Sequence, residues 1–131
     1  GSIPLEKADY AYDEGKWTIK QLVQHLTDTE RIFNYRALTF LREENAELPG
    51  FDHDHYTDNL KLDHVEYAKL VGELMTVRLS TISMYENLRE EDLARKGKAN
   101  GIELTVDNIG KINVGHAQHH IGIIKERYLE K

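Results

Sequence analysis

The sequence predicts an all-α fold, and three observations support this expectation. Only two prolines, Pro4 and Pro49, interrupt the 131 residues. Between such breakers the apolar residues recur every three or four positions, which is the repeat of an amphipathic helix. With 40% hydrophobic residues, the chain is large enough for one continuous core. We therefore expect a single domain over residues 1–131, in which Gly1 and Ser2 are a cloning scar.

The first long helix is predicted over about residues 18–44. Thr18 is a suitable N-cap residue, and Gln21 stands at the capping-box position three residues later. Pro49 and Gly50 end the helical pattern, and residues 47–59 are expected to form an irregular polar loop. The apolar face of this helix is expected to carry Ile19, Leu22, Val23, Leu26, Ile32, Phe33 and Leu41.

Two further long helices are predicted, over about residues 60–88 and 105–129, joined by a polar connection at 94–101. Thr105 can cap the third helix, and Gly115 and Gly122 would let a neighbouring helix approach it closely. The inward face of the second helix is expected to carry Val71, Leu74, Met75, Arg78, Ile82 and Tyr85. That of the third is expected to carry Ile109, Ile112, His116, His120, Ile123 and Arg127.

Histidines on these inward faces suggest a metal site. His116 and His120 are four residues apart, and two imidazoles at this spacing on a helix can bind one divalent ion. His25 lies on the apolar face of the first helix and could supply a third ligand. Three neutral imidazoles leave a coordination position open for water or substrate. Spacing alone leaves His119 as an alternative partner, and a hydrogen-bonded core cluster without metal as another interpretation.

Charged residues near His25 have distinct expected roles. Asp28, three residues later, could accept a hydrogen bond from a ligand imidazole. Glu30 and Arg78 are further candidates for a supporting role behind the metal ligands. Glu30 points aside, however, and the structural interpretation is an interhelical salt bridge with Arg78, because an unpaired cation on an apolar face would be costly. Three further histidines are expected at the surface, although the loop carrying the first two could fold over the site: His53, His55 and His64.

The composition excludes several classes of partner. The 17 basic residues are scattered among 23 acidic ones, and the net charge of −6 favours neither nucleic acid nor a membrane surface as a partner. No apolar run reaches the roughly 18 residues of a membrane span. Because the chain has no cysteine, it has no disulfide or thiolate ligand. This absence fits a reducing compartment, and we expect a cytoplasmic protein.

Three segments resemble, in order and spacing, the DinB-like (YfiT-like) superfamily of four-helix-bundle metalloproteins: KWTIKQLVQHLTDTE, LPGFDHDHY and VGHAQHHIGIIKERYL. The most specific parts are the tryptophan-led motif that contains His25 and the GHxxHH motif near the C-terminus. The resemblance implies that His25, His116 and His120 are the metal ligands. His119 then takes a flanking role. Nickel or zinc is the implied metal.

The resemblance also implies a function. Some members use the open metal site to activate a low-molecular-weight thiol, such as bacillithiol, mycothiol or glutathione. We therefore expect a metal-dependent thiol S-transferase or hydrolase that acts on an electrophilic small molecule; the thiol would be external, since the chain lacks cysteine. The alternative is a non-catalytic helical module in which metal or histidines brace the helices. A fourth ligand such as His119 or Asp54 would then close the site.

The N-terminal region departs from the family pattern. Members usually have a long helix before the counterpart of Thr18, whereas residues 1–16 are too few and are interrupted by Pro4 and Gly15. Three long helices without the fourth would leave an apolar groove exposed. We therefore expect either a truncated chain or two copies that fill each other's grooves, and we predict a homodimer.

Overall fold

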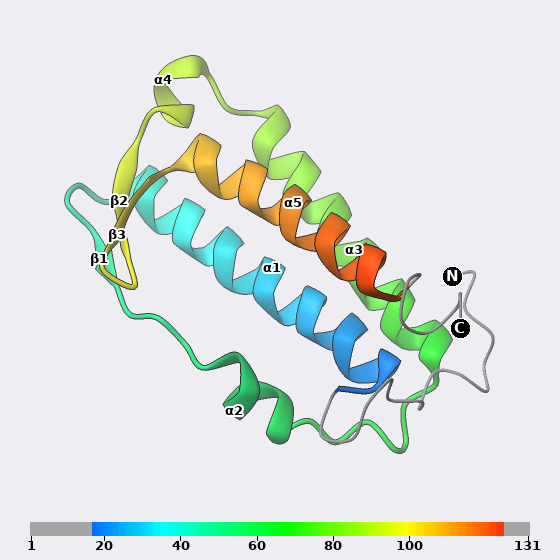
Figure 1. Ribbon diagram of the computed structural model, residues 1–131. Helices are drawn as coiled ribbons and strands as arrows, with labels where there is room; N and C mark the ends of the chain where they lie inside the picture. The colour runs from blue at the N-terminus through cyan, green and yellow to red at the C-terminus, as the bar shows by residue number, and fades with distance from the viewer. Residues whose placement is uncertain (1–16, 125–131) are drawn as a thin grey trace.

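Three long helices dominate the computed structural model, which describes the backbone of residues 17–124 and the side chains of residues 17–119. These helices are α1 (Ile19–Arg42), α3 (Tyr67–Glu86) and α5 (Val106–Ile124), and they run side by side (Figure 1). Helix α1 packs along both α3 and α5, whereas α3 and α5 share few contacts within the described residues. The central helix of the bundle is therefore α1.

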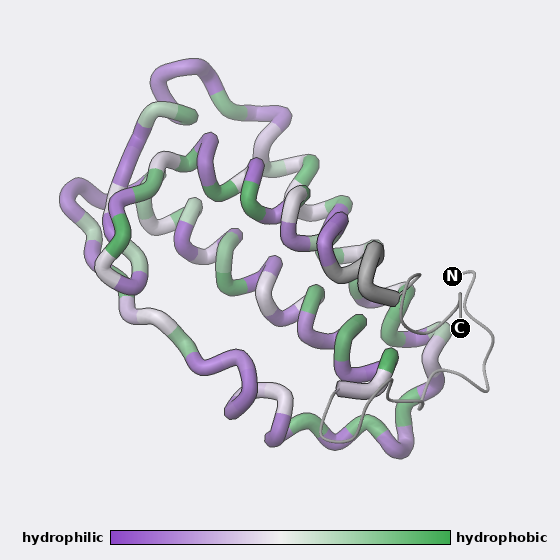
Figure 2. Tube along the Cα trace, in the orientation of Figure 1, coloured by the Kyte–Doolittle hydropathy of each residue, from purple (hydrophilic) through white to green (hydrophobic). Residues whose placement is uncertain are grey.

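A small three-stranded sheet and two short helices complete the described chain. The strands are β1 (Glu47–Leu48), β2 (Lys96–Ala99) and β3 (Ile102–Thr105); β1 pairs in parallel with β2, which pairs antiparallel with β3. The sheet lies at the end of the bundle where α1 ends and α5 begins (Figure 1). The short helices are α2 (His53–Asp58) and α4 (Glu90–Leu93), and both lie in mostly hydrophilic stretches (Figure 2).

The predicted starts of the first and third long helices are confirmed by their hydrogen bonds. The Thr18 hydroxyl accepts from the Gln21 amide at 3.1 Å, and the Gln21 side chain accepts from the Thr18 amide at 2.8 Å. Thr105 and Asn108 form the same reciprocal pair before α5. Each pair satisfies backbone N–H groups that have no partner within the helix.

The second long helix is shorter than predicted, because α3 begins at Tyr67 rather than near residue 60. Residues 60–66 form turns instead, including one closed by a bond from the Val65 amide to the Leu62 carbonyl. Asp58, Asn59 and Asp63 favour such turns, since their side chains compete for backbone groups. The predicted irregular loop at 47–59 contains β1 and α2.

The prediction of a simple connection over residues 94–101 is wrong, because β2 and β3 form a hairpin there. Asn100 and Gly101 at its turn have φ angles of 54° and 76°. Two successive positive φ angles are typical of a type I′ turn, for which Asn-Gly is the preferred sequence. The dipeptide Asn100-Gly101 indicates a hairpin turn in the sequence itself. The alternation of apolar and polar residues that marks a strand is weak in KGKA, the sequence of β2.

Two apolar clusters pack against opposite ends of α1. The first joins the beginning of α1 to α3 and contains the buried residues Ile19, Leu22, Val23, Tyr67 and Leu70. The second joins the end of α1 to the hairpin and α5 and contains Ala37, Phe40, Ala99, Val106 and Ile109. Between them, the middle of α1 buries polar side chains, among them His25, Thr29 and Glu30. The interior is therefore apolar at both ends and polar in between.

Gly97 allows the hairpin to lie directly on α1, because a Cβ atom at this position would overlap the buried ring of Phe40. We predict that Gly97→Ala lowers the free energy of unfolding by about 1–3 kcal/mol, the usual cost of overpacking. Gly72→Ala is the control: nothing lies within 4 Å of its Cβ position in α3, so alanine should stabilise the helix slightly. Urea denaturation of both variants measures the difference, and equal stabilities would contradict this account.

Candidate metal centre

Two of the predicted ligands, His25 and His116, face each other across the interface between α1 and α5. Their Nε2 atoms lie 3.2 Å apart, and their ring centroids are separated by 5.0 Å. The His25 side chain is buried and that of His116 is half-buried. The fold therefore brings together two imidazoles that are 91 residues apart in sequence.

The separation of the two nitrogens suits a shared divalent ion. Two ligands on a tetrahedral zinc ion, with Zn–N bonds of 2.0–2.1 Å, have nitrogens about 3.3 Å apart, close to the 3.2 Å seen here. A direct hydrogen bond between one protonated and one unprotonated nitrogen has a similar length, so the distance fits both the metal and the metal-free interpretation.

Thr29 is placed to orient the His25 ring. Its buried hydroxyl lies 3.4 Å from Nδ1 of His25, one helical turn further along α1. A partner on the second ring nitrogen fixes the rotation of a ligand histidine and leaves Nε2 directed at the metal. The sequence suggests Asp28 for this orienting role, but the Asp28 carboxylate accepts a hydrogen bond from Gln24 at 2.9 Å. Residue 29 lies more nearly above His25, because four residues come closer to a full turn than three.

Aromatic rings surround the histidine pair. The Trp17 ring lies 4.7 Å from that of His25 between centroids, and the Phe33 ring lies 6.4 Å from that of His116. From α2, His53 lies 5.0 Å from His25 between ring centroids. The start of α2 therefore lies beside the site, where His53 is exposed. His55 and His64 are also exposed.

Arg36 holds this loop against α1, a role that sequence analysis missed. Its guanidinium donates to the carbonyl oxygen of Pro49 at 3.2 Å and lies over the rings of Phe33 and Phe51. Phe51 in turn packs on His53, with 4.3 Å between ring centroids. The spacing in the sequence is the available signal: eleven residues are just over three full turns, which places Arg36 on the same side of α1 as His25.

The surroundings favour the neutral form of His116. Burial lowers the pKa of this imidazole, and the nearby His53 and His119 lower it further. A neutral imidazole is the form that binds a metal ion, since the lone pair of the nitrogen must be free. The electrostatics of the site are therefore compatible with a ligand role.

The third predicted ligand, His120, follows His116 by one turn of α5, but its side chain lies outside the described residues. Among the side chains of residues 17–119, no three histidine or acidic groups are arranged to hold a metal ion. His119, the alternative partner, is exposed on α5. The described part of the site thus consists of two facing imidazoles.

The predicted salt bridge between Glu30 and Arg78 is confirmed. Nε and Nη2 of Arg78 both donate to the Glu30 carboxylate, with the shortest distance 2.7 Å, and the Thr81 hydroxyl donates to it at 2.6 Å. This bidentate pair links the buried middle of α1 to α3. Both residues are also candidates as supports for the metal ligands, but these contacts bind the two helices together.

We predict that Glu30→Gln lowers the free energy of unfolding by about 2 kcal/mol or more, because it leaves a partly buried guanidinium without its carboxylate. The matched control is Glu73→Gln, which removes an exposed pair with Arg31 and should cost well under about 1 kcal/mol. Denaturant unfolding provides the stabilities, and metal content should be unchanged in both variants. Loss of metal from Glu30→Gln would show that this residue also supports the ligands.

Comparison with known proteins gives one family and several relatives. The family model described as the DinB superfamily matches residues 1–124. A protein of Bacillus licheniformis named "Putative metal-dependent hydrolase" is 27% identical over 92% of this chain and 69% of its own length. One of Oceanobacillus iheyensis with the same designation is 26% identical over 95% of this chain and 72% of its own.

A solved structure has the same fold. YfiT from Bacillus subtilis, described as "a probable metal-dependent hydrolase with an unusual four-helix bundle topology", matches with a TM-score of 0.81 and 23% identity. The match covers 95% of this chain and 72% of that one. In the described part of this chain, no helix has the length and apolar character needed to cross a bilayer.

Proposed function

Since this chain belongs to the DinB superfamily, we propose that it is a divalent-metal-dependent enzyme whose ion is held by His25, His116 and His120. The hydrolase designation of the curated relatives supports the metal and the reaction class. The observation that carries the proposal is the facing pair of Nε2 atoms, 3.2 Å apart, contributed by α1 and α5. His120 completes the set as the residue one helical turn after His116.

Nickel or zinc is the proposed metal, because imidazole nitrogens suit both ions and the chain has no thiolate to favour a softer one. A divalent ion bound by three imidazoles acts as a Lewis acid and lowers the pKa of a ligand water or thiol at its open position. Thr29 holds the His25 ring in its orientation. The rings of Trp17 and Phe33 pack beside the two imidazoles.

The nucleophile is proposed to be water or an external small thiol. A hydrolase would use water, and an S-transferase would use a thiol that the chain itself cannot supply. His53 lies beside His25 at the exposed edge of the site, where an electrophilic substrate would enter. The competing function, a metal brace without catalysis, requires a further protein ligand to close the coordination.

We predict near-stoichiometric nickel or zinc in protein purified without a histidine tag, and its loss in the His116→Ala/His120→Ala double variant. Elemental analysis makes the measurement. His64→Ala is the control, because this exposed histidine lies in a turn before α3 and should retain the metal. Absence of metal from the wild type, even after reconstitution, would leave a hydrogen-bonded histidine cluster as the interpretation.

Cobalt(II) substitution then separates the enzyme from the brace. An open position predicts that the visible spectrum of the cobalt protein changes when a small thiol is added, because the thiolate enters the coordination sphere. A closed site with four protein ligands predicts an unchanged spectrum.

Thr29→Val tests the orienting role of the threonine. We predict that metal affinity falls about tenfold or more, which is the usual effect of removing a hydrogen bond behind a ligand histidine. Thr27→Val is a closely matched control, because Thr27 is equally buried but bonds to the Val23 carbonyl instead of a histidine. Chelator competition gives the affinities, and Thr29→Ser should recover most of the loss. Equal affinities for the two valine variants would refute the role.

A further inference from the structure

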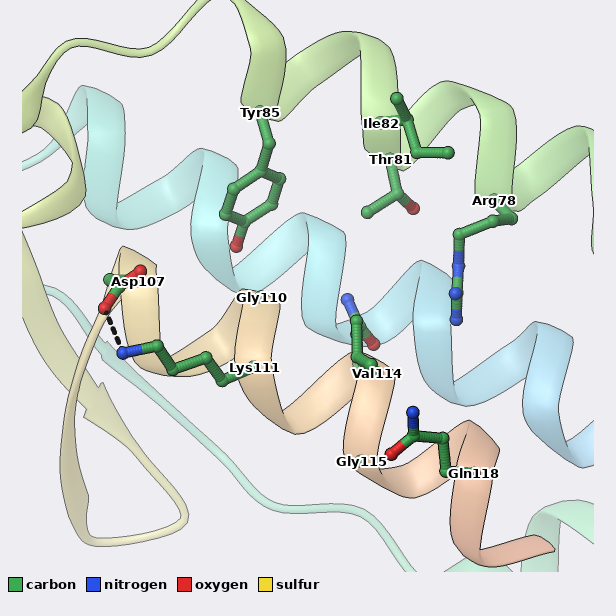
Figure 3. A pocket seen from close by; sticks show the side chains of 11 residues that line it. Arg78, Thr81, Ile82, Tyr85, Asp107, Gly110, Lys111, Val114, Gly115 and Gln118 are labelled. Carbon is green, nitrogen blue, oxygen red and sulfur yellow. Dashed lines mark ion pairs between the residues drawn. The ribbon is translucent and has the colours of Figure 1, made fainter. Parts of the chain in front are cut away.

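In the described part of the chain, the charged side chains that line the groove between α3 and α5 already have partners. The groove has a volume of about 670 Å³, and Figure 3 shows the side chains along its walls. Three apolar side chains that the sequence places on inward faces are exposed on these two helices instead: Met75, Ile82 and Ile112. Arg78 binds the Glu30 carboxylate, and Lys111 pairs with Asp107 at 2.9 Å. A charged ligand would therefore have to displace existing partners in this groove.

Arg36 differs from these cations, because no acidic side chain among the described residues binds it. Only 7% of the residue is exposed, and its hydrogen-bond partner is the neutral carbonyl of Pro49, 3.2 Å from Nη2. Burial lowers the pKa of Arg36, whereas hydrogen bonds with Glu30 raise the pKa of Arg78. A buried cation without a counter-charge is costly to the fold, and such a residue beside a candidate site suggests recognition of an anionic ligand.

The Pro49 carbonyl uses a small part of the hydrogen-bonding capacity of Arg36. A guanidinium has five N–H donors, and the bond to Pro49 comes from Nη2. Cζ of Arg36 lies over the rings of Phe33 and Phe51, at 5.4 and 5.8 Å from their centroids. These rings supply no oxygen or nitrogen acceptor. Among the described residues, the remaining donors are therefore available for the two parallel bonds by which arginine binds a carboxylate.

Arg36 lies close to the candidate metal centre. Since 5.4 Å separates Cζ from the Phe33 centroid and 6.4 Å separates that centroid from the His116 ring, Cζ lies within about 12 Å of the imidazole. The Phe51 ring also packs on His53. Because side chains on a helix lean toward its N-terminus, the guanidinium reaches back from residue 36 in the direction of His25.

We propose that Arg36 binds a carboxylate group on a small molecule that reacts at the metal centre. This inference rests on the proposed function, and it adds the charge of the reactant. A guanidinium carries one positive charge, so a carboxylate balances it, whereas a phosphate dianion would leave an excess charge in a buried position. Metal–ligand bonds of about 2 Å and hydrogen bonds of about 2.9 Å take up part of the distance between the two groups. The reactant is therefore short, with its carboxylate a few bonds from the reacting atom.

The loop that covers Arg36 is placed to admit such a ligand. The segment between β1 and α2 runs from the sheet back along α1 (Figure 1), and Pro49, Gly50 and Asp52 in it are exposed. One bond to a neutral carbonyl is weaker than two charge-assisted bonds to a carboxylate. An entering carboxylate can therefore displace the Pro49 carbonyl from Arg36.

A pair of matched thiols provides the first test. In the metal-loaded protein, 3-mercaptopropionate should bind about tenfold or more tightly than 3-mercapto-1-propanol, which has the same chain length and no charge. Arg36→Met should abolish this preference without changing the affinity for the alcohol. Arg36→Lys should keep part of it, because lysine retains the charge but not the planar fork. Isothermal titration calorimetry gives the affinities, and circular dichroism verifies that the variants fold.

The comparison of the two thiols separates anion binding from a purely structural role. A loosened loop would weaken binding of both thiols alike, whereas loss of an anion-binding group weakens binding of the carboxylate alone. Arg31→Met is the matched control, because Arg31 is an exposed arginine of α1 that pairs with Glu73. This variant should keep the preference of the wild type.

Propionate, which has no thiol, shows which reactant carries the carboxylate. If the thiol carries it, 3-mercaptopropionate should prevent propionate from binding. If the electrophile carries it, the two thiols should bind alike, and propionate should bind together with 3-mercapto-1-propanol in the wild type but not in Arg36→Met. Ligand-observed NMR detects propionate, and either result supports the role of Arg36.

Two results together would overturn the inference: equal affinities for the two thiols, and propionate binding that does not depend on Arg36. The propionate measurement can also be made on metal-free protein, because the guanidinium binds a carboxylate without the ion. A chain that binds no metal would refute the proposed function. Its failure is therefore distinguishable from a failure of carboxylate recognition by Arg36.

Discussion

Helix α1 is packed by α3 on one side and by α5 on the other. Because α1 is buried on both sides, each buried polar side chain in its middle needs a hydrogen-bond or ion-pair partner on a neighbouring helix. The rest of the structure depends on this constraint. Glu30 finds Arg78 and Thr81 on α3, and His25 meets His116 on α5. Because an unpaired buried carboxylate would cost several kcal/mol, the Glu30 contacts also define how α3 sits against α1. The apolar clusters pack the helices together at the two ends of α1, while the polar middle determines which groups face each other.

The candidate metal centre uses this constraint. The buried His25 imidazole needs a hydrogen bond, a metal ion or water, and it approaches the half-buried imidazole of His116 at a separation suitable for sharing an ion. Two contacts restrict how the site can rearrange. Thr29 lies next to the His25 ring, and Arg36 binds the Pro49 carbonyl in the loop that precedes α2. Ligands that are already held in place lose less conformational entropy when a metal ion binds, which favours binding.

The opposite side of the bundle carries a different chemistry. There α3 and α5 separate, their polar groups are paired internally, and the surface that remains is apolar. One side of α5 therefore directs a histidine toward α1, and the other leaves a glycine and a valine beside open space.

The sequence by itself determined the class, the helix caps and the ligand candidates. Thr18 with Gln21 and the apolar repeat are local signals, which depend on few neighbours and so survive folding unchanged. The family resemblance, confirmed by the superfamily match, identified His25 and His116 before their proximity was visible. The Glu30–Arg78 pair also followed from the cost of an unpaired charge.

Tertiary structure decided those features that depend on contacts between distant segments. Thr29, and not Asp28, lies next to the His25 ring. Arg36 holds the loop that carries His53 close to the site. Met75 and Ile82 are exposed on α3. Periodicity indicates that a helix has an apolar side, but a wide apolar face leaves the rotation of that helix open until its neighbours are in place.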